Sequence, residues 1–282
     1  MTIAVLGATG GQGGAVLAAL RSAGQPVRAV VRDPRTARAQ ALAASGIELA
    51  QADLTDPDAL ARAFDGASAA FAVTTPFGEG MDAEKQQGIA IVDAAGRASL
   101  PFLVMASVAS ADRNTGIPHF ETKAHIEKAL AESGLPATVV APTYFYENAL
   151  GSREIARGEM SMALPSDVPL QQVSRANVGQ VVAAVLAEPA RWLGARLEVA
   201  GDAPTPAEMA RSIGRASGRH IAYREIPLAS VELASPDMAA MFAYLTEVGY
   251  AVDAAATRAD FPEVPWTSFT DWAAGQNWSM RG

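Results

Sequence analysis

Short apolar runs alternate with longer amphipathic stretches along the first half of the chain. The runs are rich in Val, Ile, Leu and Ala and hold few polar residues, as expected for strands that are buried on both faces of a parallel sheet. The predicted strands cover residues 3–6, 27–31, 47–50, 69–73, 101–106 and 137–141.

The stretches between these runs have helical spacing. Aspartate at Asp56 and proline at Pro57 mark one helix start, because aspartate caps a helix and proline suits its first turn. The other predicted helices cover residues 13–23, 82–98 and 119–133. Strands that alternate with helices indicate βαβ units. The pattern therefore predicts an α/β fold with a Rossmann-type, doubly wound parallel sheet.

This alternation loosens after about residue 142. Alternating apolar residues at 160–164 predict a half-buried strand, residues 177–187 a helix and residues 196–200 another strand. Thr205 and Glu208 form a capping box at a further helix start, and the tail is rich in Tyr, Phe and Trp. We expect a Rossmann-type domain over residues 1–150, whose sheet later segments complete, and a smaller α+β C-terminal lobe over 151–282 that packs on it.

Composition narrows the possible functions. The chain has 282 residues and a formal net charge of -8, so direct binding to nucleic acid is not expected. It has no cysteine and three scattered histidines, which excludes disulfides and thiolate sites and predicts no metal site. Residues 1–6 lack the basic start of a signal peptide, and no apolar run is long enough to span a bilayer. We expect a cytoplasmic protein without membrane contact.

A glycine-rich segment directly follows the first predicted strand and opens the first helix. Gly7 permits a sharp turn, Gly10 lets the backbone approach a pyrophosphate, and Gly13 allows close packing of helix and sheet. The free N–H groups of the helix start favour phosphate. The candidate cofactor residues of this loop are Gly7, Thr9, Gly10, Gln12 and Gly13. A tight turn without a ligand is the alternative.

The end of the second predicted strand bears on which dinucleotide binds. Arg32 stands where a basic side chain would neutralise a ribose 2′-phosphate, whereas Asp33 would suit a ribose hydroxyl. A guanidinium matches phosphate geometry. We therefore favour NADP(H) over NAD(H), with NAD(H) still open. A solvated Arg32 paired with Asp33 is the alternative.

The glycine spacing of Gly7, Gly10 and Gly13 resembles the short-chain dehydrogenase/reductase superfamily. That resemblance implies that Asp53 borders the adenine and that Thr74, Thr75 and Pro76 line the ribose and nicotinamide path. The superfamily uses Tyr-x-x-x-Lys on a helix, which puts both side chains on one face.

The matching segment here is residues 119–123, in which Lys123 is present and His119 replaces the tyrosine. Lys123 is the candidate ribose ligand, and histidine titrates near neutrality and could donate a proton. Ser107 stands where a substrate-orienting hydroxyl often lies. A surface ion pair of Lys123 with Glu127 and an ordinary strand-end Ser107 are the alternatives.

Together with the glycine loop, three segments resemble the NmrA-like family of atypical short-chain reductases. They are residues 31–34, 119–123 and 142–148. The resemblance implies a cleft between a Rossmann domain and a small lobe, with Pro142 and Thr143 toward the cofactor. Candidate substrate residues are Phe77, Tyr144, Phe145, Tyr146 and Asn148, and Met160 and Met162 could add to an apolar pocket. Ala141 departs from the family, in which arginine often precedes the proline.

The resemblance leaves two functions open. One is an NADPH-dependent reductase of a small unsaturated or quinone-like substrate, with Lys123, His119 and Ser107 as catalytic residues. The other is a non-catalytic NADP(H)-sensing regulator that binds a protein partner. A homodimer is also compatible with the sequence.

Overall fold

Over the residues that the structure describes, the main sheet has seven parallel strands, and β1 lies inside it. The computed structural model describes residues 2–278. The first strand pairs with the second on one side and with the fourth on the other, so the strand order reverses there. In spatial order the strands are β10 (Arg196–Val199), β6 (Ala137–Pro142), β5 (Leu103–Ala106), β4 (Ala67–Ala72), β1 (Thr2–Leu6), β2 (Val27–Val31) and β3 (Glu48–Gln51). Ligands bind at such a reversal, beyond the carboxyl ends of the strands.

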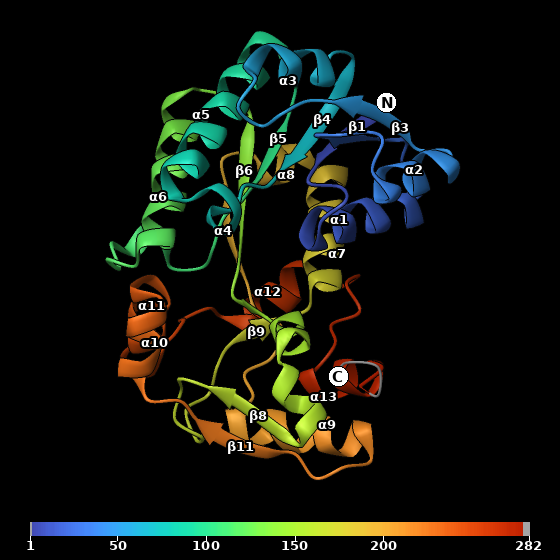
Figure 1. Cartoon of the computed structure of the whole chain (residues 1–282). Coiled ribbons are helices and arrows are strands. Elements are labelled where there is room, and N and C mark those ends of the chain that lie inside the picture. Colours follow the sequence, from blue (N-terminus) through green and yellow to red (C-terminus); the bar gives the residue numbers. More distant parts are fainter. Residues whose placement is uncertain (1, 279–282) are drawn as a thin grey trace.

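Both faces of the sheet are buried, which explains the uninterrupted apolar runs. In β1, Ile3 and Val5 belong to one core, and Ala4 and Leu6 belong to the other. One face is covered by α1 (Gly11–Ser22), α2 (Ala37–Ala44), α7 (Arg175–Ala187) and α8 (Pro189–Trp192), and α12 (Ala254–Asp260) contacts β10. The other is covered by α3 (Pro57–Phe64), α5 (Met81–Arg97) and α6 (Pro118–Glu132) (Figure 1). The predicted Rossmann-type α/β fold is confirmed.

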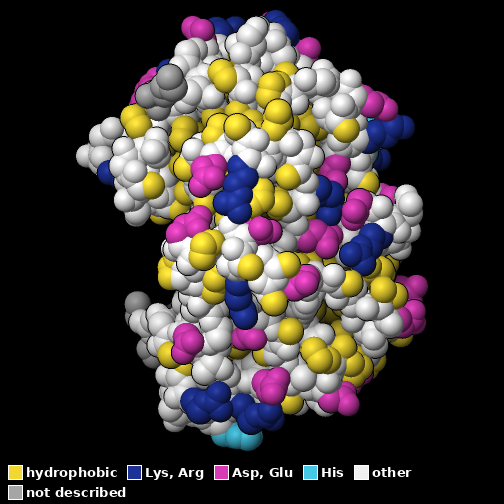
Figure 2. Space-filling view, turned by 180° about the vertical axis from the view of Figure 1, so that it is seen from behind, with side chains coloured by type: hydrophobic (Ala, Val, Ile, Leu, Met, Phe, Trp, Pro, Cys, Tyr) yellow, Lys and Arg dark blue, Asp and Glu magenta, His cyan; other side chains and the backbone are white. Residues whose placement is uncertain are grey.

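The remaining elements form a lobe beside the carboxyl ends of the strands (Figure 1). Its strands are β7 (Tyr144–Phe145) paired with β9 (Gln172–Val173), and β8 (Glu159–Met162) paired with β11 (Ala222–Glu225). Its helices are α9 (Pro206–Ser217), α10 (Leu228–Ala234), α11 (Pro236–Glu247) and α13 (Phe269–Ala274), with 3-10 turns η2 (Tyr146–Gly151) and η3 (Arg153–Arg157). A short helix, α4 (Pro76–Glu79), and the turn η1 (Ala111–Arg113) follow β4 and β5. The face in Figure 2 narrows between the two parts, and charges of both signs are interspersed on it.

The chain returns from the lobe to the main sheet. Helix α7 packs on α1, and β10 adds an edge strand next to β6. The aromatic tail is divided in the same way, because its rings face different cores. Phe269 and Trp272 lie in the core of the lobe, whereas Phe261 stacks on Trp192 of α8 with ring centroids 4.8 Å apart. The expectation that the whole tail belongs to the lobe is therefore wrong for Phe261.

Local signals placed the helix starts well. Asp56 accepts a hydrogen bond from the backbone N–H of Ala59 at 2.9 Å, and Thr205 and Glu208 form the predicted capping box at α9. Helix α2 was not predicted, and Ala39 is its one buried residue, so it has no apolar stripe for a periodicity to detect. Among residues 2–278, no helix is long and apolar enough to cross a membrane.

Candidate functional site

A cleft of about 760 Å³ opens where β1, β4, β5 and β6 end and the lobe begins. It brings together most of the residues that the sequence singled out. The predicted residues that line it are Gly7, Gly10, Gln12, Gly13, Thr74, Thr75, Pro76, Phe77, Ser107, His119, Lys123, Pro142, Thr143, Tyr144, Phe145 and Asn148. Six predicted residues do not line it, namely Thr9, Arg32, Asp53, Tyr146, Met160 and Met162.

The glycine loop has the geometry of a phosphate cradle. Gly7 has a φ of 66°, which favours glycine, and its carbonyl accepts the backbone N–H of Gly10 at 2.8 Å. A Cβ on Gly13 would overlap the backbone of Gly7. No side chain caps the start of α1, and the Gln12 amide nitrogen is buried without a hydrogen-bond partner. These unpaired donors fit a bound dinucleotide pyrophosphate.

Arg175 brings a positive charge to this loop, and the sequence analysis missed it. Its Nη1 lies 2.5 Å from the point where a Cβ on Gly11 would stand. The guanidinium also lies over the ring of Phe145 at 5.3 Å, and the backbone N–H donates to the carboxylate of Glu147. Arg175 is the first residue of α7. The one local signal was the capping Ser174, which gives no hint of the distant glycine loop.

The residues expected at the adenine end lie outside the cleft lining. The Arg32 side chain is 75% exposed, and its guanidinium lies 3.2 Å from the carboxylate of Glu79 in α4. The alternative pairing with Asp33 does not occur, because Asp33 binds Arg35 instead, which lowers the pKa of that aspartate. Arg32 therefore lies at the carboxyl edge of the sheet, as predicted. Its ion pair with Glu79 is exposed enough for another anion to replace the Glu79 carboxylate.

Two other expected cofactor residues, Asp53 beside the adenine and Thr9 in the glycine loop, bind protein atoms. The side chain of Asp53 accepts hydrogen bonds from Thr55, which lower the pKa of the carboxyl group. The carbonyl of Thr9 accepts a hydrogen bond from Arg38 at 3.3 Å. Asp53 here has the contacts of a loop-stabilising residue, which was the plainer interpretation of its sequence position.

Lys123 is held in a buried polar cluster. Its Nζ lies 2.9 Å from Oε1 of Glu84 and donates to the carbonyl and hydroxyl oxygens of Thr74 at 2.8 and 2.9 Å. Glu84 is completely buried and also accepts the hydroxyl of Thr122. Burial lowers the pKa of Lys123, and the charge of Glu84 opposes this shift. The sequence analysis missed Glu84, because a glutamate in the first turn of a helix ordinarily faces solvent.

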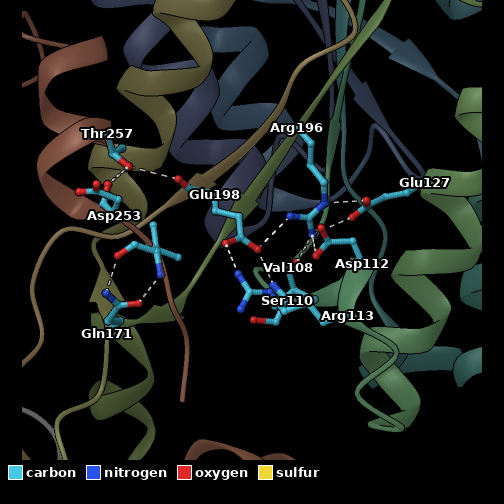
Figure 3. A network of polar contacts seen from close by, with 11 residues as sticks. Val108, Ser110, Asp112, Arg113, Glu127, Gln171, Arg196, Glu198, Asp253 and Thr257 are labelled. Atoms are coloured by element: carbon cyan, nitrogen blue, oxygen red, sulfur yellow. Dashed lines mark hydrogen bonds and ion pairs between the residues drawn. The ribbon is translucent and has the colours of Figure 1, made fainter. Parts of the chain in front are cut away.

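The alternative partner of Lys123, Glu127, is bound elsewhere. Its carboxylate accepts the hydroxyl of Ser107 and lies 2.8 Å from Nε of Arg196 on β10. Arg196 also pairs with Glu198 at 2.9 Å (Figure 3). Ser107 therefore lies in the cleft wall with its hydroxyl directed to Glu127, and this network joins β5, α6 and β10 beneath the cleft. The alternative of a surface ion pair between Lys123 and Glu127 is wrong.

His119 lies in the first turn of α6 and contacts the lobe. Its Nδ1 lies 2.7 Å from Oδ1 of Asp237 on α11, and the same oxygen accepts the backbone N–H of His119 at 3.0 Å. The ring is flanked by Phe77, at 5.7 Å between centroids, and by Phe120 at 4.8 Å. Nothing in the local sequence indicated Asp237 as a partner, because the two segments meet only in the folded chain.

One part of the cleft lining is apolar and aromatic. Val108, Phe120, Met238, Met241 and Tyr250 line it together with the predicted Tyr144 and Phe145. Burial raises the pKa of both Tyr144 and Tyr250, which keeps their hydroxyls neutral. Such a wall suits a flat, unsaturated molecule.

Tyr146 does not take part in this wall. It begins η2, is fully buried in the core of the lobe, and donates its hydroxyl to the carbonyl of Thr267 at 3.0 Å. The side chain turns inward because the extended backbone of Tyr144 and Phe145 ends there. Met160 and Met162 are likewise buried in the cores of the lobe, outside the cleft lining. Within residues 2–278, no group of His, Asp and Glu side chains is arranged to hold a metal.

Comparison with known proteins agrees with this geometry. The chain is 31% identical to quinone oxidoreductase 2 of Escherichia coli over 231 residues, which is 79% of this chain and 77% of the relative. It is 28% identical to an NAD(P)H azoreductase of Xenophilus azovorans, over 84% of this chain and 81% of the relative.

A solved structure of an NADPH-dependent quinone oxidoreductase of E. coli in complex with NADPH superposes with a TM-score of 0.79. It is 28% identical and matches 96% of this chain and 98% of the other. The sequence model of the NmrA-like family matches residues 1–273. The chain therefore belongs to the NmrA-like family.

Proposed function

We propose that this protein is an NADPH-dependent reductase of small quinone-like or otherwise unsaturated carbonyl compounds. One observation carries the proposal. A single cleft is lined by the phosphate cradle, by an apolar aromatic wall, and by Lys123 and His119. A cofactor and a flat acceptor can therefore lie in contact in the same cavity. The relatives named as quinone oxidoreductase and azoreductase support this class of acceptor.

The residues around the cradle can hold each charged part of NADPH. The loop N–H groups and the Gln12 amide would bind the pyrophosphate, with Arg175 as its counter-charge. Arg32 would exchange Glu79 for the 2′-phosphate, and the exposed position of that pair makes the exchange inexpensive. Lys123 would hold the nicotinamide ribose next to Thr74. When bound, NADPH supplies the hydride.

The protein's own contribution is placement and polarity. The apolar wall, with Tyr144, Met238 and Met241, would hold the acceptor and exclude water. The Lys123 ammonium near the reacting groups would stabilise negative charge that develops on the acceptor oxygen. His119 is the residue of the cleft that could return a proton to this oxygen.

The test follows oxidation of NADPH with a panel of quinones and azo dyes. We expect acceptor-dependent oxidation, and we expect Lys123→Met to remove most of it. Lys128→Met is the matched control, because Lys128 lies on the same helix with a 74% exposed side chain. Binding of NADPH without turnover of any acceptor would contradict the proposal and favour a sensor of the cofactor.

A further inference from the structure

A histidine and an aspartate from different parts of the chain form a pair at the wall of the cleft. His119 and Asp237 are separated by 118 residues, and their side chains are 11% and 13% exposed. Asp237 also takes the place of a helix cap, since no side chain of the preceding residues caps α6. The lobe thereby holds both the backbone and the ring of His119.

The Asp237 carboxylate determines which ring nitrogen of His119 remains free for a molecule in the cleft. An ionised aspartate only accepts hydrogen bonds, so Nδ1 of His119 must carry the proton that Asp237 receives. Within the described residues, no protein atom forms a hydrogen bond with Nε2, and His119 lines the cleft. Nε2 is therefore the atom that can exchange a proton with a molecule in the cleft.

We propose that Asp237 is a positioning residue that holds His119 as the proton donor to the acceptor, an inference that rests on the proposed reductase function. The acceptor gains two electrons and one hydrogen as the hydride from the nicotinamide nucleotide, and its oxygen becomes an anion. The N–H bond at Nε2 of the imidazolium breaks, and its proton forms the O–H bond of the reduced product. The neutral ring keeps the proton on Nδ1, which donates a hydrogen bond to Asp237. Nε2 then takes up a new proton from water.

The placement of Asp237 links proton delivery to substrate contact. The next residue in α11, Met238, and Met241 one turn later both line the apolar part of the cleft. Because the three residues share one short helix, a molecule seated against the methionines lies beside the ring that Asp237 orients.

The first experiment reads the ring directly, without cofactor or acceptor. Nitrogen-15 NMR of the imidazoles can be assigned with His119→Gln, because the chain has only three histidines. We expect the neutral His119 ring to be protonated at Nδ1, and we expect Asp237→Leu, which removes the accepting oxygen, to lose this preference. Glu232→Gln, which removes an exposed charge from the neighbouring helix α10, should leave the spectrum unchanged. A neutral ring protonated at Nε2 in the natural protein would overturn the proposal.

The second experiment compares kinetic constants. Asparagine retains an oxygen that can cap α6, so Asp237→Asn isolates the loss of charge from loss of the cap. We expect kcat to fall about 100-fold in Asp237→Asn and in His119→Gln, with no further fall in the double variant. The KM for NADPH should change less than about twofold, because neither residue touches the phosphate cradle. Glu232→Gln should keep the natural kcat.

The outcomes separate the two proposals. Turnover by the natural protein with an unchanged kcat in Asp237→Asn would overturn the positioning role and leave the reductase function standing. Multiplicative losses in the double variant would also overturn it, because the two residues would then act independently. Absence of turnover with every acceptor would refute the reductase function and, with it, the proton-donor role of His119.

Discussion

Replacing Glu84 by glutamine tests whether Lys123 depends on its buried carboxylate. Glu84 is completely buried, the Lys123 side chain is 10% exposed, and their charged atoms lie 2.9 Å apart. Breaking such a pair typically costs 3–5 kcal/mol because one charge is left uncompensated. Glutamine can still accept from Thr122 and Thr74, so we expect the lower end, about 3 kcal/mol in the free energy of unfolding.

Urea denaturation of a double-mutant cycle measures this effect. Glu84→Gln and Lys123→Met should each destabilise the protein, and the double variant should recover at least about 1 kcal/mol relative to either, since no unpaired charge remains. Lys128→Met and Glu132→Gln are the matched controls. That pair lies on the same helix α6 at 3.8 Å, with side chains 74% and 68% exposed, and its loss should cost less than about 0.5 kcal/mol.

The sign of the pH dependence follows from the shifted pKa of Lys123. Burial lowers this pKa and Glu84 opposes the shift, so Glu84→Gln should lower it further. The unfolded lysine keeps its proton up to a pH of about 10.4, where the folded variant has already lost it. The stability of Glu84→Gln should therefore rise with pH up to about that value. A variant within about 0.5 kcal/mol of the natural protein at neutral pH would refute the buried pair.

Three further variants test other parts of the site. Arg32→Ala should weaken NADPH about tenfold and leave NADH nearly unchanged in calorimetry, because only NADPH carries the 2′-phosphate; equal losses would refute this role. Arg175→Ala should weaken both nucleotides by a similar factor of about ten, since both carry the pyrophosphate; a loss confined to NADPH would contradict that assignment. Tyr146→Phe should cost about 1 kcal/mol of stability through the lost hydrogen bond to Thr267, with cofactor affinity and kcat unchanged. A change in KM for the acceptor would contradict this and indicate that Tyr146 contributes to the cleft.

Much of the main sheet was predictable from the sequence. The strands over residues 3–6, 27–31 and 137–141 are buried on both faces, and such runs leave a clear apolar signal. The glycine loop was predictable as well, because its shape depends on adjacent residues and on the strand and helix that flank it. Lys123 was identified because residues 119–123 resemble the Tyr-x-x-x-Lys segment of the short-chain dehydrogenase/reductase superfamily.

The partners of these residues were not predictable. Glu84 resembles any acidic residue in the first turn of a helix, Arg175 any polar residue after a cap, and Asp237 any aspartate before an apolar stretch. The sequence analysis predicted that Tyr146 lines the cleft, as its neighbours Tyr144 and Phe145 do. The chain turns into η2 at Tyr146, so its side chain points into the core of the lobe instead.

The amino-acid sequence alone determined the βαβ pattern, the phosphate loop and the helix that carries His119 and Lys123. These features depend on periodicity and on contacts between near neighbours. Only the tertiary structure decided which polar side chains pair. Lys123 contacts Glu84, and His119 contacts Asp237, because the fold packs helices together that are far apart in the chain. Both pairs are largely buried, and a charge removed from water must be paired. Each pair therefore fixes the direction in which its two side chains point.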